Sequence, residues 1–313
     1  MTRSRLLRAR TTSDPGPDPV PMPSPAPDPR PTFLLGVGAQ KGGTTWLHDH
    51  LAASPQCVAG YRKEYHVFDA LDLASERWMH DRITLRARRE GRRAVDGEPV
   101  DAHGLHRAAM LYDPELYVDY FLGLLSRDPA YRLTLDMTPA YGLLSAQRLA
   151  WIRDQFGARG VRTVSVFLMR DPVDRIWSHL RMEQSRRPER LSQDSAVHVR
   201  ELFAEPTYAA RTRYDETLRA LDQAFGPDEV HVGFYEQLFT HEQVEAVTRL
   251  VGIEGHEPQF DVRVNASPEA AEQLPLDTVR AVARYYRDVY VAVAARFPDL
   301  DLAALWPSAR YLG

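Results

Sequence analysis

A short apolar run that leads into a glycine-rich turn constrains the fold of this chain more than any other feature of its sequence. Residues 33–38 (FLLGVG) are too few for a helix and end on glycine, which predicts a buried strand of a parallel sheet. The turn follows at residues 40–45 (QKGGTT), and we expect a helix from about Thr44 to a stop at Ser54 and Pro55. A strand, a tight turn and a helix in this order begin an α/β fold.

Three later apolar runs predict further strands, at residues 131–136, 163–168 and 230–234. Helical patterns lie between them, so we predict an α/β fold with a central, mainly parallel sheet flanked by helices. The chain has 313 residues, 44% of them hydrophobic, which is enough for one domain over residues 32–313. Residues 1–31 form a separate tail, expected to be disordered because proline recurs at almost every second position of its later part.

Bulk charge and cysteine content exclude several classes of function. The net charge is −4 and the pI is near 6.3, so we expect no nucleic-acid partner and no general attraction to anionic membranes. Cys57 is the only cysteine, which leaves no intrachain disulfide and no cysteine metal site. No apolar run approaches the length of a membrane span, and the first residues lack the apolar core of a secretory signal. A cytoplasmic protein is therefore expected, and its oligomeric state stays open.

The turn has the parts of an anion-binding site. Consecutive backbone N–H groups at a helix start, together with the positive end of the helix dipole, attract an anion. Gly42 and Gly43 let the backbone approach the anion closely, and Lys41 adds a positive charge. The hydroxyl groups of Thr44 and Thr45 add two further donors. A purely structural turn would explain the glycines but neither the lysine nor the threonines.

The same glycines are compatible with a nucleotide triphosphatase loop, G-x-x-x-x-G-K-[ST], and the position of the lysine argues against it. Gly38 and Gly43 have the required spacing, but Thr44 stands where that loop has its lysine. Lys41 instead precedes the two glycines, on the strand side of the turn. We therefore expect a different transferring group from that of a triphosphatase.

A second segment with charged and hydroxyl groups, residues 170–179 (RDPVDRIWSH), follows the predicted strand 163–168. Arg170 lies where a parallel strand ends, the edge at which open α/β sheets bind ligands. Pro172 suits the first turn of a helix, which would carry Ser178 about two turns later. An arginine with a hydroxyl nearby is suited to a phosphate dianion.

Together with residues 63–69 (KEYHVFD) and 135–141 (LDMTPAY), these segments resemble the sulfotransferases that use 3′-phosphoadenosine-5′-phosphosulfate (PAPS) as donor. The resemblance is closest to the heparan sulfate sulfotransferase-like group and its bacterial relatives, and it covers about residues 33–306. It implies a P-loop-like three-layer fold and transfer of a sulfuryl group from PAPS to an acceptor hydroxyl. It also implies that the reaction requires no metal.

The resemblance assigns the donor-binding residues. It implies that Lys41 contacts the 5′-phosphate and the sulfate, and that Arg170 and Ser178 hold the 3′-phosphate. It places a last loop over the nucleotide at about residues 263–267, which equally fit a connecting turn before the amphipathic pattern of residues 276–297. The other residues that it implies in donor binding lie in the first turn and helix: Gly42, Gly43, Thr44, Thr45 and Trp46.

The resemblance also implies a catalytic base in residues 63–69. A hydroxyl is a poor nucleophile until its proton can leave, and Glu64 is expected to accept that proton. His66 is the alternative base, because an imidazole titrates nearer neutral pH. Lys63 would stabilise charge on the sulfate, and Asp69 would hold the His66 ring or contact the substrate.

One position departs from the heparan sulfate pattern. Those enzymes usually carry a Glu-Lys pair before the Thr-Pro-Ala-Tyr run, and this chain has Asp136 and Met137 there. The missing lysine argues against a highly anionic glycan acceptor, while Asp136 is still a candidate to orient the substrate or to act as a second carboxylate. A sugar hydroxyl, a hydroxylated natural product and a lipid head group all stay admissible as acceptors.

Two other functions are compatible with the residues. One is a P-loop kinase that acts on a small molecule, which the position of Lys41 disfavours. The other is a nucleotide-binding protein without catalysis. Polar, charge-rich stretches at residues 70–112 and 183–208 are predicted to cover the acceptor pocket, and their side chains do not name a substrate.

Overall fold

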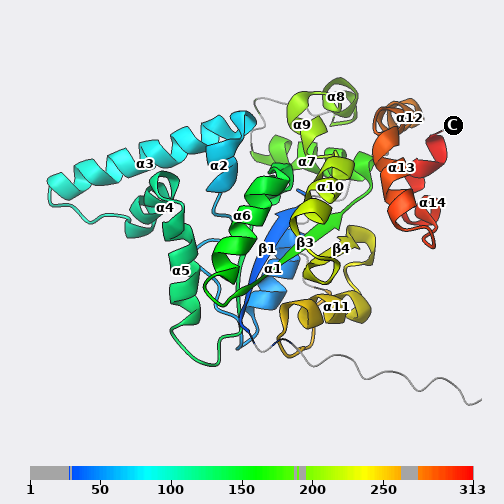
Figure 1. Ribbon diagram of the computed structural model, residues 1–313. Coiled ribbons are helices and arrows are strands. Elements are labelled where there is room, and N and C mark those ends of the chain that lie inside the picture. The colour runs from blue at the N-terminus through cyan, green and yellow to red at the C-terminus, as the bar shows by residue number, and fades with distance from the viewer. Residues whose placement is uncertain (1–27, 29, 187–188, 190–194, 262–273, 313) are drawn as a thin grey trace, which may run out of the picture.

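The centre of the molecule is a four-stranded parallel sheet (Figure 1). The strands are ordered β2-β1-β3-β4, so the first strand of the chain lies inside the sheet. Each neighbouring pair is parallel, and all four carboxyl ends therefore lie at one edge, where open α/β folds bind ligands. The computed structural model describes residues 28, 30–186, 189, 195–261 and 274–312.

Strands and helices alternate along the chain. The strands are β1 (Thr32–Gly38), β2 (Leu133–Met137), β3 (Arg162–Met169) and β4 (Val230–Phe234). The helices before β3 are α1 (Thr44–Ala52), α2 (Phe68–Asp72), α3 (Arg77–Val95), α4 (Ala102–Tyr112), α5 (Glu115–Leu125) and α6 (Ala146–Gly157). The later helices are α7 (Pro172–Arg186), α8 (Ser195–Leu202), α9 (Pro206–Ala210), α10 (Tyr214–Ala224), α11 (His241–Val251), α12 (Leu276–Tyr285), α13 (Arg287–Arg296) and α14 (Leu302–Leu305). Short 3₁₀ helices are η1 (Ala74–Glu76), η2 (Pro139–Leu143), η3 (Pro227–Glu229), η4 (Tyr235–Gln237) and η5 (Pro307–Tyr311).

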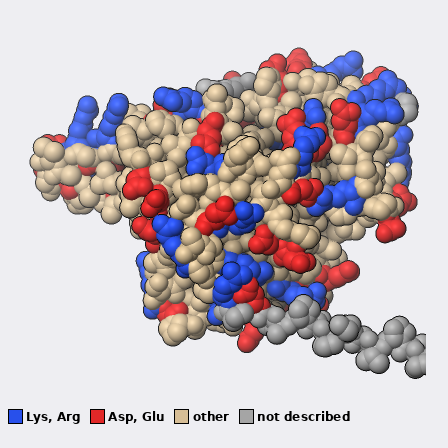
Figure 2. All heavy atoms as spheres, viewed as in Figure 1, with Lys and Arg blue, Asp and Glu red and all other residues tan. Residues whose placement is uncertain are grey.

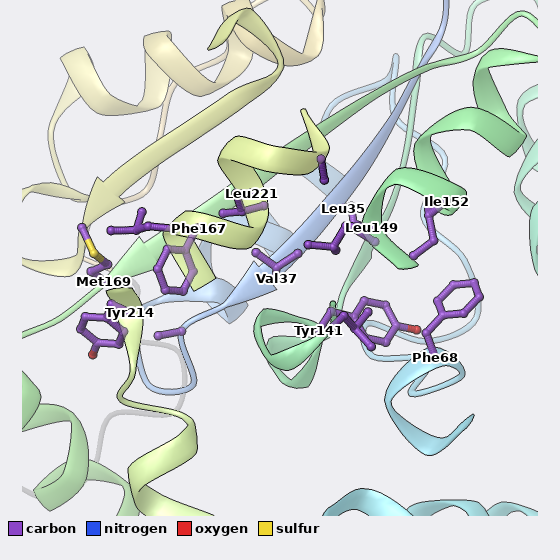
Figure 3. Packing of buried hydrophobic residues seen from close by; sticks show 14 of the residues in the cluster. Leu35, Val37, Phe68, Tyr141, Leu149, Ile152, Phe167, Met169, Tyr214 and Leu221 are labelled. Carbon is purple, nitrogen blue, oxygen red and sulfur yellow. The ribbon is translucent and has the colours of Figure 1, made fainter. Parts of the chain in front are cut away.

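Hydrophobic side chains cover both faces of the sheet and form two separate clusters. Along β1, Leu34 enters one cluster, whereas Leu35 and Val37 enter the other, as side-chain alternation along a strand requires. Helices α6 and α10 cover Leu35 and Val37 with Leu149 and Leu221 (Figure 3). Helices α1 and α11 cover the opposite face. Burial on both faces explains why residues 33–38 of β1 are a continuous apolar run in the sequence.

The structure confirms the predicted fold class, with the four strands shifted by at most two residues at an end. The helix expected from Thr44 begins there and ends at Ala52, before Ser54. The Pro-rich tail lies outside the described residues up to residue 27, and so does the loop predicted at residues 263–267. Those two expectations stay predictions.

Helices α3 and α4 project from the body of the molecule as an arm (Figure 1). They pack against each other, and they occupy most of the stretch 70–112 that was predicted to cover the acceptor pocket. Among the helices that the structure describes, none is long and apolar enough to cross a membrane.

The turn after β1 packs directly against the end of β3. The Ala39 N–H donates to the Leu168 carbonyl at 2.8 Å, and the Gly42 N–H donates to the Ala39 carbonyl at 2.9 Å. A Cβ added at Gly42 would overlap the Leu168 carbonyl oxygen. Gly43 has φ = +88°, a left-handed conformation that favours glycine. The two glycines are therefore required by close packing and by backbone conformation respectively.

Replacing Gly42 by alanine tests this packing. We expect Gly42→Ala to lower the free energy of unfolding by about 1–3 kcal/mol, because the obstacle is backbone that cannot move aside cheaply. Urea denaturation followed by circular dichroism measures the change. Gly123→Ala is the matched control: Gly123 is exposed in α5 with open space around it, so alanine should raise stability by about 0.5–1 kcal/mol. Equal effects of the two substitutions would contradict the packing argument.

Candidate functional site

The first turn places the start of α1 at the carboxyl edge of the sheet. The N-cap residue of α1 is Gly43, and no side chain caps the first turn of this helix. The first backbone N–H groups of a helix lack partners within the helix, and together with the helix dipole they favour an anion. The turn is therefore suited to receive a phosphate or sulfate group.

Five basic side chains surround this turn. Burial, and then the charges of four neighbouring cations, together lower the pKa of Lys41 to about 8. The neighbours are Arg170, Arg186, Arg181 and Lys63. Over the described residues, neither Lys41 nor Arg170 forms an ion pair with a carboxylate. Like charges gathered around Lys41 and Arg170, two cations that no carboxylate among the described residues pairs with, indicate an anion site.

Unpaired polar atoms point to the same place. The Nε atoms of Arg170 and Arg181 are buried without a hydrogen-bond partner in the part of the chain that the structure describes. The Arg170 guanidinium lies 4.3 Å from the centre of the Tyr235 ring, and its Nη1 donates to the Lys41 carbonyl at 3.4 Å. A buried guanidinium nitrogen without an acceptor costs free energy, which an oxyanion at this position would recover.

A row of four charged side chains runs from the turn along residues 63–69. Lys63 Nζ lies 3.4 Å from the hydroxyl of Thr44, in the first turn of α1, and donates to Glu64 Oε1 at 2.9 Å. His66 Nε2 contacts Glu64 Oε2 at 3.2 Å, and His66 Nδ1 contacts Asp69 Oδ2 at 2.7 Å. Charges therefore alternate along the row, and its first member touches the anion site.

The pKa values of Glu64 and His66 give their protonation states at neutral pH. Burial favours the neutral form of Glu64, but hydrogen bonds and charge from His66 and Lys63 outweigh it and lower its pKa to about 2. Burial likewise favours neutral His66, but hydrogen bonds to Asp69 and Glu64 outweigh it and raise its pKa to about 9. At neutral pH Glu64 is a carboxylate and His66 is an imidazolium that donates from both nitrogens.

Asp136 lies beneath the backbone of this row and forms a hydrogen bond with it. Its carboxylate accepts hydrogen bonds from the Thr138 hydroxyl at 2.6 Å and the Tyr117 hydroxyl at 2.8 Å, and the Tyr65 N–H approaches it at 3.3 Å. Asp136 is 0% exposed, and burial raises its pKa to about 6. One of its oxygens faces the Tyr65 N–H, in the backbone between Glu64 and His66. That Asp136 orients the substrate or acts as a second carboxylate stays a prediction.

Comparison with known proteins identifies the family of the chain. A family model described as the sulfotransferase family matches residues 31–257. The chain belongs to the sulfotransferase family. No curated protein sequence matches it. The narrower likeness to the heparan sulfate group stays a prediction.

One solved structure shares the fold, and two others are less similar. The sulfotransferase from Alicyclobacillus acidocaldarius has 18% sequence identity and a TM-score of 0.55, over 88% of this chain and 98% of that chain. The sulfotransferase domain of the Synechococcus PCC 7002 olefin synthase has 16% identity and a TM-score of 0.39, over 84% and 96%. The sulfotransferase domain from the curacin biosynthetic pathway has 17% identity and a TM-score of 0.38, over 75% and 77%.

The other predicted residues of this sulfotransferase lie close to the turn or on elements that meet there. Asp69 is 0% exposed and holds the His66 ring, one of the two roles considered for it. Thr45 follows Thr44 in the first turn of α1, and Trp46 lies nearly buried beside the Phe239 ring. Ser178 lies on the buried face of α7, about two turns after Arg170.

Sequence reasoning missed residues that hold Arg170 in place. The Tyr214 hydroxyl donates to the Arg170 carbonyl at 2.8 Å. The next residue, Asp171, accepts from the Ser308 hydroxyl at 2.6 Å and from the Ser308 N–H at 3.2 Å. Glu236 accepts from the Asp171 N–H at 3.0 Å. Ser308 is 137 residues away in sequence, so no local pattern points to it.

Two further basic residues were missed as well. Arg181 lies one turn after Ser178 in α7, and helical spacing could have placed it beside the predicted phosphate site. His48, in α1, is close enough to Lys63 and Glu64 for their charges to act on its pKa, which burial lowers. Across the described residues, no group of three or more His, Cys, Asp and Glu could hold a metal ion.

The pH dependence of anion binding tests the cation cluster. Because the pKa of Lys41 is about 8, this lysine is charged at pH 7 and neutral at pH 9.5. We expect the affinity for inorganic sulfate to fall roughly tenfold or more over that range, since one charge-assisted contact is lost. Isothermal titration calorimetry at the two pH values measures it.

Lys41→Arg is the matched variant, because a guanidinium keeps its charge at pH 9.5. It should bind sulfate with a much smaller loss between the two pH values. An equal loss in the wild type and in Lys41→Arg would contradict the assignment of the titrating group to Lys41.

Proposed function

We propose that this sulfotransferase moves the sulfuryl group of PAPS to an acceptor hydroxyl, with Glu64 as the general base. The observation that carries the proposal is the position of Lys63. Its Nζ lies 3.4 Å from Thr44 Oγ1 at the anion site and 2.9 Å from Glu64 Oε1. Lys63 therefore contacts both the anion site, which would hold the donor, and Glu64, the carboxylate that would take the proton.

The donor fits two separated anion sites on the same sheet edge. The 5′ end would lie on the turn, against Lys41 and the N–H groups at the start of α1, where the uncapped helix favours an anion. The 3′-phosphate would lie against Arg170 and Ser178, and the unpartnered Nε of Arg170 supplies a donor for it. Two sites suit a nucleotide that carries phosphate at both the 3′ and the 5′ position.

The reaction is an in-line displacement at sulfur. The acceptor oxygen forms the new S–O bond while the bond between sulfur and the 5′-phosphate oxygen breaks, and the acceptor proton passes to Glu64. The products are a sulfate ester and 3′-phosphoadenosine-5′-phosphate. Lys41 and Lys63 stabilise negative charge on the leaving phosphate and on the sulfuryl oxygens, so positioned cations supply much of the rate enhancement.

The charge row favours Glu64 over His66 as the base. With its pKa raised to about 9, His66 already carries a proton on each nitrogen at neutral pH and has no site for another. Glu64 is unprotonated, and its side chain is 37% exposed, so an acceptor can reach it. When Lys63 turns toward the sulfuryl group, Glu64 loses a hydrogen bond and a neighbouring charge, and its basicity rises.

Nucleotide binding tests the donor assignment. We expect 3′-phosphoadenosine-5′-phosphate to bind more tightly than ATP in isothermal titration calorimetry. Arg170→Ala should lower the affinity for this ligand about tenfold or more, because a charged contact to the 3′-phosphate is lost. The same variant should bind adenosine-5′-phosphosulfate, which lacks the 3′-phosphate, with nearly the affinity of the wild type. Tighter binding of ATP would favour a small-molecule kinase and overturn the proposal.

The pH profile of turnover tests the base. If Glu64 accepts the proton, kcat at saturating donor stays nearly flat from pH 6 to 8. If His66 must first lose its proton, kcat rises about tenfold per pH unit toward pH 9, because the neutral fraction does so.

Glu64→Gln keeps the size of the side chain and removes its basicity. This variant should lower kcat by about 10²–10⁴-fold while donor binding persists. Full activity in Glu64→Gln would contradict the assignment of the base. Donor binding without turnover of any hydroxyl acceptor in the wild type would instead indicate a non-catalytic nucleotide-binding protein. The acceptors to screen are sugars, hydroxylated natural products and lipid head groups, with mass detection of the sulfate ester.

A further inference from the structure

The arm formed by α3 and α4 carries an exposed stripe of basic and large apolar side chains. At about 100° per residue, five side chains of α3 fall within about 80° of arc. They are Trp78, Arg82, Leu85, Arg89 and Arg92, all exposed, and together they are called the α3 stripe. Trp78 is 52% exposed and Leu85 50%. The stripe is about 21 Å long, from fourteen residue steps of 1.5 Å.

The opposite face of α3 is fixed to the protein. Met79 and Ile83 are buried in the hydrophobic core, and Glu90 is buried and accepts a hydrogen bond from the Asp101 N–H at 2.8 Å. Helix α3 is therefore held by its other side, and the α3 stripe faces outward on a fixed support. Blue side chains stand along the upper edge of this arm in Figure 2.

The three arginines of the stripe have no carboxylate partner among the described residues. Arg86 and Arg93, which lie beside the stripe, pair with Asp101 at 2.7 Å and with Glu98 at 3.1 Å. Arg82, Arg89 and Arg92 make no ion pair with any residue that the structure describes. The whole chain has a net charge of −4, so this basic face is a local feature.

We propose that the α3 stripe is a docking surface for another protein, which presents an acidic amphipathic helix to it. Trp78, Leu85 and Arg92 are spaced by seven residues, and Arg82 and Arg89 repeat the same spacing beside them, as in the seam of two packed helices. Tryptophan and arginine are the residues that contribute most at protein interfaces. Glutamates on the partner would pair with the three arginines, and apolar side chains would cover Trp78 and Leu85.

Two other occupants fit less well. A second copy of this chain would bring the stripe against itself in a symmetric dimer, and its three arginines would then repel their own copies. A membrane would gain little, because the stripe offers only two apolar side chains seven residues apart. Stable membrane binding usually needs a larger apolar face or a longer basic cluster.

Binding of a synthetic peptide to the full-length protein tests the proposal. The probe is a fluorescent helix of about 20 residues, with leucines and glutamates on one face at the spacing of the stripe. The control peptide has the same composition in an order that spreads these residues around the helix. In fluorescence anisotropy, we expect the first peptide to bind at least tenfold more tightly than the second, and more weakly as salt increases.

Variants locate the contact. The triple substitution Arg82→Glu, Arg89→Glu and Arg92→Glu should lower the affinity for the probe at least tenfold. Trp78→Ala should lower it about fivefold. The matched control reverses three exposed arginines elsewhere, at Arg127, Arg219 and Arg249, and should bind the probe as the wild type does. None of these residues belongs to the proposed catalytic site, so donor binding should be unchanged. Measuring donor binding therefore checks that each variant is folded.

Other outcomes would overturn the proposal. Equal binding of the two peptides would show attraction by charge without a docking geometry. Binding to vesicles of phosphatidylcholine and phosphatidylglycerol at 7:3 that is lost in the stripe variant would assign the surface to a membrane. A dimer in analytical ultracentrifugation that the stripe variant abolishes would assign it to a second copy.

Discussion

The close approach between the first turn and the end of β3 is the contact on which the rest of the site depends. The Ala39 N–H pairs with the Leu168 carbonyl, and Gly42 lies where a side chain would overlap that carbonyl. This packing brings the start of α1 beside Arg170, which follows β3 directly. Two anion-binding groups from segments more than a hundred residues apart are thereby held at one edge of the sheet.

The charges at this edge explain how such a site can serve catalysis. Lys41 lies near Lys63, Arg170 and other cations, whose charges repel its own, and burial together with this repulsion lowers the pKa of Lys41 to about 8. An oxyanion relieves this repulsion. Lys63 also pairs with Glu64. In the proposed mechanism, movement of Lys63 toward the bound donor releases this carboxylate for proton transfer, which would couple donor binding to activation of the base.

Local sequence patterns were sufficient for the fold and for the groups that bear charge. The strands are short apolar runs, the turn is a run of six residues, and Glu64, His66 and Arg170 belong to compact motifs. The pattern could not show which way Asp136 points, because β2 is buried on both faces and its alternation carries no information about the site. It also could not show the contact of Ser308 with Asp171, since that contact depends on how distant segments pack.

A crystal structure of the protein with 3′-phosphoadenosine-5′-phosphate tests the central claim most directly. The account predicts the 5′-phosphate on the N–H groups at the start of α1, within reach of Lys41, and the 3′-phosphate on Arg170 and Ser178. Lys63 should then lie between the 5′-phosphate and Glu64. A nucleotide bound away from the turn, or with its 3′-phosphate not in contact with Arg170, would contradict the account.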